Sequence, residues 1–217
     1  MIEITYSDKL KPLLKLGAPT RGPQWLDYAK QFGLTTADEA ELLRMAQDKD
    51  LNQLKSKNRA VFAPLHAIRA LKQVGTEAIV TPLIQILEAY EDDDWVSVDI
   101  PRTLAKLGKS VIPEIEQYLR NVSNSESARF SLASFYTACD EQHPHLRSTL
   151  TNSAHSLISD FDRFEPEFNA FIICELMRLH AISSLPAIRL ACLSKQVEEI
   201  ICGDYADIKA HIESAEI

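Results

Sequence analysis

The sequence is poor in the features that mark β-strands and membrane insertion. Only 6 of the 217 residues are glycine, and an alternating apolar pattern is confined to residues 2–4. Because half-buried strands need that alternation over about 4–8 residues, the chain is predicted to be all-α. No apolar run approaches the roughly 18 residues of a membrane helix. Residues 1–6 lack the basic and apolar regions of a signal peptide, so we expect no membrane partner.

Cysteine is also scarce and carries no recognisable motif. The four cysteines are widely spaced, without a Cys-x-x-Cys pair: Cys139, Cys174, Cys192 and Cys202. Each falls in an apolar segment with helical periodicity, where a cysteine behaves as a small hydrophobic side chain. We therefore expect reduced core thiols and a cytoplasmic location, since disulfides mark oxidising compartments.

Basic charge is in short supply as well. The chain has 23 Lys and Arg against 31 Asp and Glu, which gives a net charge of −8. A protein that grips phosphate backbones needs a basic footprint. We therefore expect no nucleic-acid partner.

What the sequence does contain is an internal repeat. A Leu-x-x-apolar-Gly pattern occurs twice, as Leu71-x-x-Val74-Gly75 and as Leu104-x-x-Leu107-Gly108. The glycines at positions 75 and 108 give a period of 33 residues, and the same offset pairs Phe62 with Trp95 and Ile86 with Leu119. A repeat of this length with helical periodicity is typical of stacked helix pairs.

The repeat divides the chain into three expected regions within one continuous structural unit. Residues 1–56 read as an N-terminal helical cap, residues 57–196 as helix-pair repeats, and residues 197–217 as closing helix. Capping boxes are predicted at Thr36–Glu39 and at Ser123–Glu126. Three prolines are expected to bend helices from within: Pro64, Pro82 and Pro101.

The segment 67–84 resembles a HEAT-like repeat, of the short bacterial kind first grouped with phycobilisome lyases. It reads Ala-Ile-Arg-Ala-Leu-Lys-Gln-Val-Gly-Thr-Glu-Ala-Ile-Val-Thr-Pro-Leu-Ile. The resemblance is good over residues 60–121, looser over 125–194 and absent over the first fifty. It implies a right-handed α-α superhelix, a HEAT-like solenoid, whose inner helices line a concave surface. Such a pattern specifies architecture and says little about function.

Enzymes of related architecture provide chemistries to compare. Deoxyhypusine hydroxylases bind two irons through His-Glu pairs on successive repeats, and no histidine here is followed by glutamate. HEAT-like DNA glycosylases need a cationic concave face, which a net charge of −8 does not favour. Neither activity is expected.

General catalytic motifs are missing too. The segment 17–22 has the glycine spacing of a P-loop but continues Pro23-Gln24, not Lys-Ser/Thr. Cys139 and His143 are four residues apart and could form a thiolate–imidazolium pair, although a buried cysteine beside a helix-end histidine is the favoured interpretation. His143 and His145 offer two metal nitrogens without a third local ligand. We expect no catalytic residues, no metal site and no cofactor.

The most unusual local feature is an acidic run ending in tryptophan, at residues 91–95. In one interpretation the acids form a solvated loop that caps the next helix, and Trp95 packs between neighbouring units. In the other, an acidic ridge with an aromatic anchor binds a basic or amphipathic partner segment. The candidate protein-binding residues are Asp92, Asp93, Asp94 and Trp95, extended by Gln85, Glu88, Glu114, Gln117 and Arg120 on the expected inner helices.

The sequence therefore predicts a non-catalytic HEAT-like repeat scaffold that binds a protein or peptide partner through its concave or acidic surface. The alternative is an accessory bilin lyase or a bilin-binding chaperone. An acidic protein could bind the propionates of a bilin only if arginines lined its groove, and the candidates for that are Arg69, Arg102 and Arg129.

Overall fold

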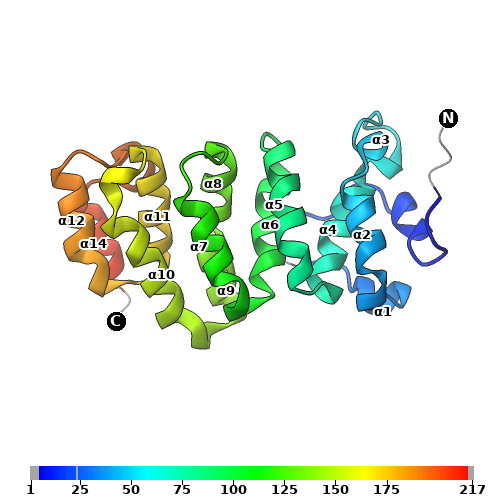
Figure 1. Cartoon of the computed structure of the whole chain (residues 1–217), viewed down its shortest axis with the longest axis horizontal. Coiled ribbons are helices and arrows are strands. Elements are labelled where there is room, and N and C mark those ends of the chain that lie inside the picture. The colour runs from blue at the N-terminus through cyan, green and yellow to red at the C-terminus, as the bar shows by residue number, and fades with distance from the viewer. Residues whose placement is uncertain (1–4, 23, 215–217) are drawn as a thin grey trace. The chain divides into compact units, whose positions relative to one another are not determined.

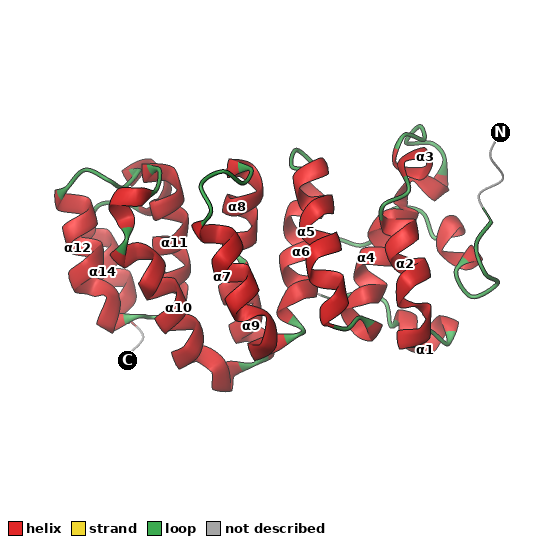
Figure 2. Cartoon of the chain, viewed as in Figure 1, coloured by secondary structure: helices red, strands yellow, loops and turns green. Residues whose placement is uncertain are grey.

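The computed structural model describes residues 5–22 and 24–214, and no strand occurs among them (Figure 2). The prediction of an all-α protein is confirmed for this part of the chain, and residues 2–4 lie outside it. The chain divides into two compact units, Met1–Leu107 and Gly108–Ile217. None of the described helices combines the length and apolar character that crossing a membrane requires.

Helix α4 (Ala63–Val74) forms the centre of the first unit (Figure 1). It packs against α1 (Tyr28–Phe32), α2 (Glu39–Ala46) and α6 (Asp94–Ala105). Every residue from Ala63 to Leu71 is buried, because neighbouring helices pack around α4. The other helices of the unit are η1 (Lys11–Lys15), η2 (Thr36–Asp38), α3 (Lys49–Asn52), η3 (Arg59–Phe62), η4 (Glu77–Ile79) and α5 (Val80–Ala89), where η denotes a 3-10 helix.

Proline positions differ from the prediction in this unit. Pro64 lies in the first turn of α4, where its missing N–H removes no helical hydrogen bond, and the preceding residues form the separate helix η3. Pro82 is the third residue of α5, again within the first turn. Only Pro101 is inside a helix as expected, in α6. Two of the three predicted bends are therefore wrong, because each helix begins later than its apolar pattern.

In the second unit, α10 (Arg147–Ser159) and α11 (Pro166–Arg178) pack against each other at the centre. Helix α10 also contacts α7 (Ile112–Arg120), α9 (Phe135–Gln142) and α12 (Leu185–Leu193), while α11 contacts α8 (Glu126–Ala133), α13 (Glu199–Cys202) and α14 (Tyr205–Glu213). The remaining helices are η5 (Gly108–Val111), η6 (Pro144–Leu146), η7 (Phe161–Arg163) and η8 (Ile182–Ser184). The segment expected as closing helix contains two helices, α13 and α14, separated at Gly203 (φ 84°).

Neither predicted capping box is formed by the predicted residues. The first is formed by Thr35 and Asp38, one residue before the predicted pair. At the second position Ser125, not Ser123, accepts the backbone N–H of Ala128 and caps α8. Several polar residues precede each helix, and their spacing alone does not determine which of them becomes the N-cap residue.

The two repeat glycines have different backbone conformations. Gly75 is extended, with φ −71°, whereas Gly108 is left-handed, with φ 69°. A Cβ atom at Gly75 would lie 2.6 Å from the carbonyl oxygen of Leu71, which leaves no room for a side chain. Glycine is thus required at one turn by close backbone approach and at the other by a positive φ.

Candidate functional site

The loop at residues 17–22 is fixed to the buried helix α4. The imidazole Nε2 of His66 lies 2.8 Å from the carbonyl oxygen of Gly17, and Nη1 of Arg69 donates to the carbonyl oxygen of Thr20 at 2.9 Å. Because a carbonyl can only accept, Nε2 of His66 carries the proton, and its Nδ1 accepts from the Tyr28 hydroxyl at 2.7 Å. These contacts hold Arg21 at a defined place beside α4 and α6.

Arg69 also forms a buried ion pair with Asp99 of α6. Its Nε donates to one carboxylate oxygen at 2.6 Å and its Nη2 to the other at 3.3 Å, and both residues are only 2% exposed. The guanidinium carbon lies 4.8 Å from the ring centroid of Trp25 and 5.4 Å from that of Trp95. Burial raises the pKa of Asp99, and the hydrogen bonds from Arg69 oppose that rise. Each polar group of the pair is satisfied, as a buried ion pair requires.

A cavity of about 160 Å³ opens above this pair. We call it the arginine cavity, and it is lined by Arg21, Gly22, Arg69, Asp94, Trp95, Val98, Asp99 and Arg102. Four of its five α6 members, Trp95, Val98, Asp99 and Arg102, are spaced i, i+3, i+4 and i+7, so they share one helix face. Arg21 lies over the Trp95 ring, with 5.0 Å between guanidinium carbon and ring centroid.

A second cavity, of about 210 Å³, also borders Trp95. We call it the apolar cavity, because most of its lining is hydrophobic: Ala46, Asn52, Val61, Phe62, Pro64, Leu65, Ile68, Ile86, Tyr90, Asp93, Trp95 and Val96. Trp95 is half-buried and is the one residue named in both linings. An aromatic wall thus separates a charged cavity from a hydrophobic one.

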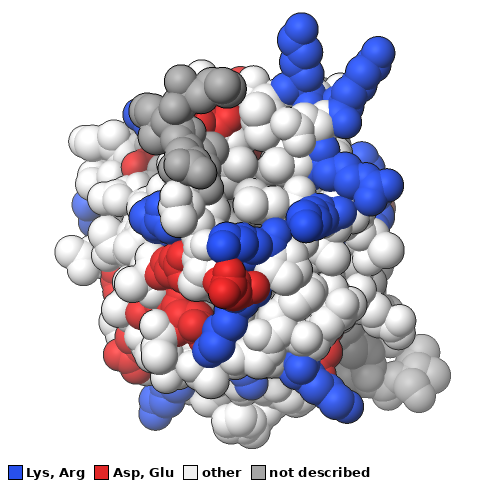
Figure 3. Space-filling model, turned by 90° about the vertical axis from the view of Figure 1, so that its right-hand side faces the viewer, with Lys and Arg blue, Asp and Glu red and all other residues white. Residues whose placement is uncertain are grey.

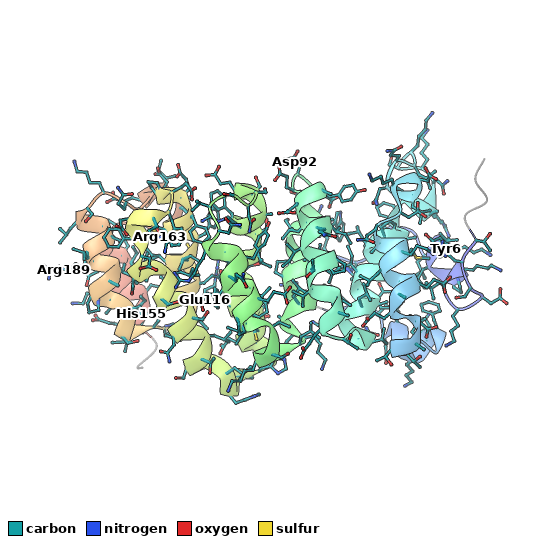
Figure 4. All side chains as sticks on the ribbon, viewed as in Figure 1. Tyr6, Asp92, Glu116, His155, Arg163 and Arg189 are labelled. Carbon is teal, nitrogen blue, oxygen red and sulfur yellow. The ribbon has the colours of Figure 1, made fainter. Side chains whose placement is uncertain are left out.

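The residues of the predicted acidic ridge differ in their positions and contacts. Asp93 accepts from the backbone N–H groups of Trp95 and Val96 and therefore caps α6. Asp94 is exposed and lines the arginine cavity. Asp92 is exposed in the loop between α5 and α6, and Figure 4 labels it above the end of α5. The capping interpretation thus holds for Asp93, while Asp94 and Trp95 reach a cavity.

The remaining predicted residues lie on two helices. Gln85 and Glu88 are exposed on α5 of the first unit. Glu114 and Gln117 are exposed on α7 of the second unit. Arg120 is half-buried and fully engaged, because it donates to Glu116, Asp160 and Ser156 at 3.0, 2.6 and 2.8 Å.

Arg120 belongs to a polar network between α7 and α10 in the second unit. Glu116 accepts from Ser153 at 2.6 Å and from Ser156 at 2.9 Å, in addition to Arg120. Burial alone would raise the pKa of Glu116, but the hydrogen bonds from these three residues hold it below its usual value. Figure 4 labels Glu116 at this point on α7. The network joins two helices and accounts for Arg120 structurally.

The cysteines show no activation. Burial raises the pKa of Cys139 to about 11 and that of Cys202 to about 12, and the pKa values of Cys174 and Cys192 are raised for the same reason. A nucleophilic cysteine needs a lowered pKa. Across residues 5–22 and 24–214, no cluster of three or more potential ligands could hold a metal ion.

The start of the first unit carries basic side chains on its surface. Figure 3 shows Lys and Arg spread over this face, with acidic side chains grouped on one part of it. Exposed basic residues in this region are Lys9, Lys11, Lys15, Lys30, Arg44, Lys49, Lys55, Lys57 and Arg59. Several are paired with acids, as Lys9 is with Asp38 at 3.1 Å. The average charge of the chain gave no indication of this uneven distribution.

The fold and these two cavities define an all-helical protein with a candidate binding surface around one tryptophan. No protein-family model, no curated protein and no solved structure matches the chain. The sequence predicted Asp94 and Trp95 as binding residues and named Arg69 and Arg102 only as candidate groove arginines for a bilin, while Arg21 and Asp99 were missed. The signal for Asp99 was available, since a helical wheel places Asp99 and Arg102 on the same face as Trp95.

Proposed function

We propose that this chain is a HEAT-like repeat protein that binds a protein or peptide partner without catalysing a reaction. The observation that carries the proposal is the position of Trp95 between the arginine cavity and the apolar cavity. An amphipathic segment would insert an apolar side chain on one side of Trp95 and a charged group on the other. Aromatic residues that wall such pockets are frequent energetic centres of protein interfaces.

The helix order supports the HEAT-like part of the proposal. Helices α4 and α5 follow one another around Gly75, and α6 and α7 follow one another around Gly108, with the 33-residue spacing of the sequence repeat. Each pair joins its helices through a short 3-10 segment, η4 or η5. A right-handed superhelix of such pairs remains part of the proposal.

Rigidity of the surface also supports binding. Trp95 is held by Arg69 and Arg21, and Asp93 caps its helix. A surface that is already ordered loses little conformational entropy when it binds. The acidic residues Asp92 and Asp94 are exposed beside the cavities, and they would attract a basic part of the partner.

No specific observation favours bilin attachment. The larger of the two cavities, at about 210 Å³, is smaller than the roughly 300–1,000 Å³ that usually enclose a drug-sized ligand. Arg129 is 0% exposed and donates to Leu119 and Glu165, so it is committed within the second unit.

Quantitative affinity capture tests the proposal. Immobilised wild-type protein and its Trp95→Ala, Asp92→Lys and Asp162→Lys variants are exposed to native lysate, and the recovered proteins are compared. We expect a specific partner whose dissociation constant rises by at least about tenfold for Trp95→Ala and by a smaller factor for Asp92→Lys. Asp162 is exposed in η7 of the second unit and serves as the matched charge control.

Equal recovery by the wild type and Trp95→Ala would contradict the proposal. Asp93 is left unchanged because it caps α6, so its replacement would alter the helix along with the surface.

A further inference from the structure

The apolar cavity contains one charged side chain. Asp93 is the single charged residue among the described residues that line this cavity of about 210 Å³. Its Oδ1 accepts the backbone N–H groups of Trp95 and Val96, at 2.8 and 3.1 Å. Its Oδ2 has no hydrogen bond or ion pair with any residue in the described part of the chain. One carboxylate oxygen at the wall of the cavity is therefore available to a donor from another molecule.

Two uncharged side chains of the same lining also have a polar atom to offer. Nδ2 of Asn52 donates to the carbonyl oxygen of Asp48 at 3.0 Å, which leaves Oδ1 of Asn52 without a donor among residues 5–22 and 24–214. The hydroxyl of Tyr90, a half-buried residue just after α5, likewise has no hydrogen bond to these residues. The wall thus presents three acceptors, from Asn52, Tyr90 and Asp93, on a largely apolar surface.

A lysine side chain matches this combination. Its ammonium group has three donors and no acceptor, and its methylene groups can be buried along apolar surface while the charge remains at the end. The aromatic rings of Phe62, Tyr90 and Trp95 in the lining favour an alkyl stem and a cation alike. An arginine matches less well, because its two-point contact needs both oxygens of a carboxylate, and Oδ1 of Asp93 is already engaged at the start of α6.

We infer that the apolar cavity binds the side chain of a lysine that the partner supplies. The inference rests on the proposed function and refines it, because the side chain that enters on this side of Trp95 is then apolar along its stem and cationic at its end. At about 210 Å³ the cavity is below the size of drug-binding pockets, so it fits one long side chain.

The charges around the apolar cavity favour a cation. Asp92 precedes Asp93 in the chain, is exposed and forms no ion pair among the described residues, so it adds a second negative charge beside the first. The exposed basic residues of the segment 49–59 are not part of the lining. On the other side of Trp95, Arg102 is engaged within the chain, and the remaining charges offset one another, Arg69 against Asp99 and Arg21 against Asp94. A carboxylate ligand would be repelled by Asp92 and Asp93.

Binding can be followed in ¹H–¹⁵N spectra of the full chain, through the indole N–H of Trp95 and the backbone N–H groups of Trp95 and Val96 that contact Asp93. Only two tryptophans are present, and Trp95→Phe identifies the indole signal by its loss. The probes are short capped peptides with one central residue between alanines: lysine, arginine, norleucine, acetyl-lysine or trimethyl-lysine. We expect the lysine peptide to bind at least about fivefold more tightly than any of the others. Norleucine and acetyl-lysine lack the charge, trimethyl-lysine lacks N–H donors, and arginine lacks a second free oxygen on the carboxylate.

Variants then assign the groups that bind the ammonium. Asp93→Asn should weaken binding of the lysine peptide on the order of tenfold. Its remaining side-chain oxygen still caps α6, since asparagine and aspartate are about equally good N-cap residues. Tyr90→Phe keeps the ring, removes the hydroxyl and should weaken binding roughly two- to fivefold. Asp162→Asn removes an exposed carboxylate in η7 of the second unit and should have no effect.

The inference is overturned if norleucine or acetyl-lysine binds as tightly as lysine, if Asp93→Asn leaves the affinity unchanged, or if the lysine peptide shifts no signal at up to about 10 mM. Equal or tighter binding of arginine or trimethyl-lysine would likewise exclude a hydrogen-bonded lysine ammonium. Partner capture that is lost with Trp95→Ala but retained with Asp93→Asn, together with peptides that all bind alike, would leave the proposed function standing and remove this inference alone.

Discussion

Arg69 and Asp99 join α4 to α6 through a buried two-point contact, with nitrogen–oxygen distances of 2.6 and 3.3 Å. The pair lies directly beneath the arginine cavity and contributes to its lining. Arg69 also approaches the rings of Trp25 and Trp95, so the position of the candidate anchor depends on this ion pair.

Removing one partner of this pair should be strongly destabilising. Asp99→Ala leaves the Arg69 charge buried and uncompensated, which typically costs about 3–5 kcal/mol. Urea unfolding followed by tryptophan fluorescence measures the effect, because both tryptophans belong to the first unit. The double variant Arg69→Met/Asp99→Leu should lose less stability than Asp99→Ala. If the unfolding free energy of Asp99→Ala lay within about 1 kcal/mol of the wild-type value, the ion pair would have to be accessible to water.

The first unit should lose stability in mild acid through His66. Burial lowers the pKa of this imidazole below the usual histidine value of about 6.5, so the unfolded chain takes up a proton at a higher pH than the folded one. Stability is therefore full above about pH 6.5 and declines as pH falls from there toward the depressed folded pKa. Tryptophan-monitored urea midpoints at pH 7.5 and 5.5 measure this decline. His66→Gln should reduce the difference, and an unchanged difference would exclude His66 as its source.

Substitutions at the two repeat glycines should separate their roles. Gly108 has φ 69°, so Gly108→Asn should be tolerated better than Gly108→Val, because asparagine adopts left-handed conformations more readily. At Gly75 both should be harmful, since any Cβ meets the Leu71 carbonyl oxygen at 2.6 Å. Thermal unfolding monitored by circular dichroism provides the comparison. We expect the strained variants to lose about 1–3 kcal/mol of unfolding free energy. Equal effects of Asn and Val at Gly108 would contradict the conformational argument.

Glu116 should stabilise the second unit in its charged form. The hydrogen bonds from Ser153, Arg120 and Ser156 hold its folded pKa below 4.5, so its contribution is present above pH 4.5 and is lost as pH falls through the folded pKa. Glu116→Gln should therefore reduce protection of α7 and α10 amides from hydrogen exchange at pH 7, by about 1 kcal/mol. At pH 3 the amide protection of the variant and that of the wild type should become similar. A deficit that stays constant with pH would indicate lost packing and not lost charge.

The helical class followed from the sequence because periodicity and scarce glycine both report on local structure. Helix boundaries were less accessible. Thr36 and Ser123 satisfied the capping pattern, yet Thr35 and Ser125 begin the caps. The apolar helical pattern that contains Cys139 is divided at Ser134 into α8 and α9. Such choices depend on which side chains a neighbouring helix can bury, and local patterns do not contain that information.

The candidate site was visible only in part for a related reason. The acidic run and Trp95 are adjacent in sequence and attract notice. Arg21 and Arg69 reach Trp95 from a loop and from another helix, across separations that no local pattern records. The role of Asp93 as a cap was one of the two interpretations of the acidic run, and the geometry decides it for that residue.

Site-specific photo-crosslinking tests the central claim most directly. Val98, which lines the arginine cavity, is replaced by p-benzoylphenylalanine, and Leu190 on α12 of the second unit, which is 55% exposed, receives the same group as a control. After irradiation in native lysate, we predict one partner crosslinked at Val98 and absent at Leu190, with the crosslink suppressed by excess unlabelled wild-type protein. Crosslinks of equal yield at both positions, or none at Val98, would contradict a partner-binding surface around Trp95.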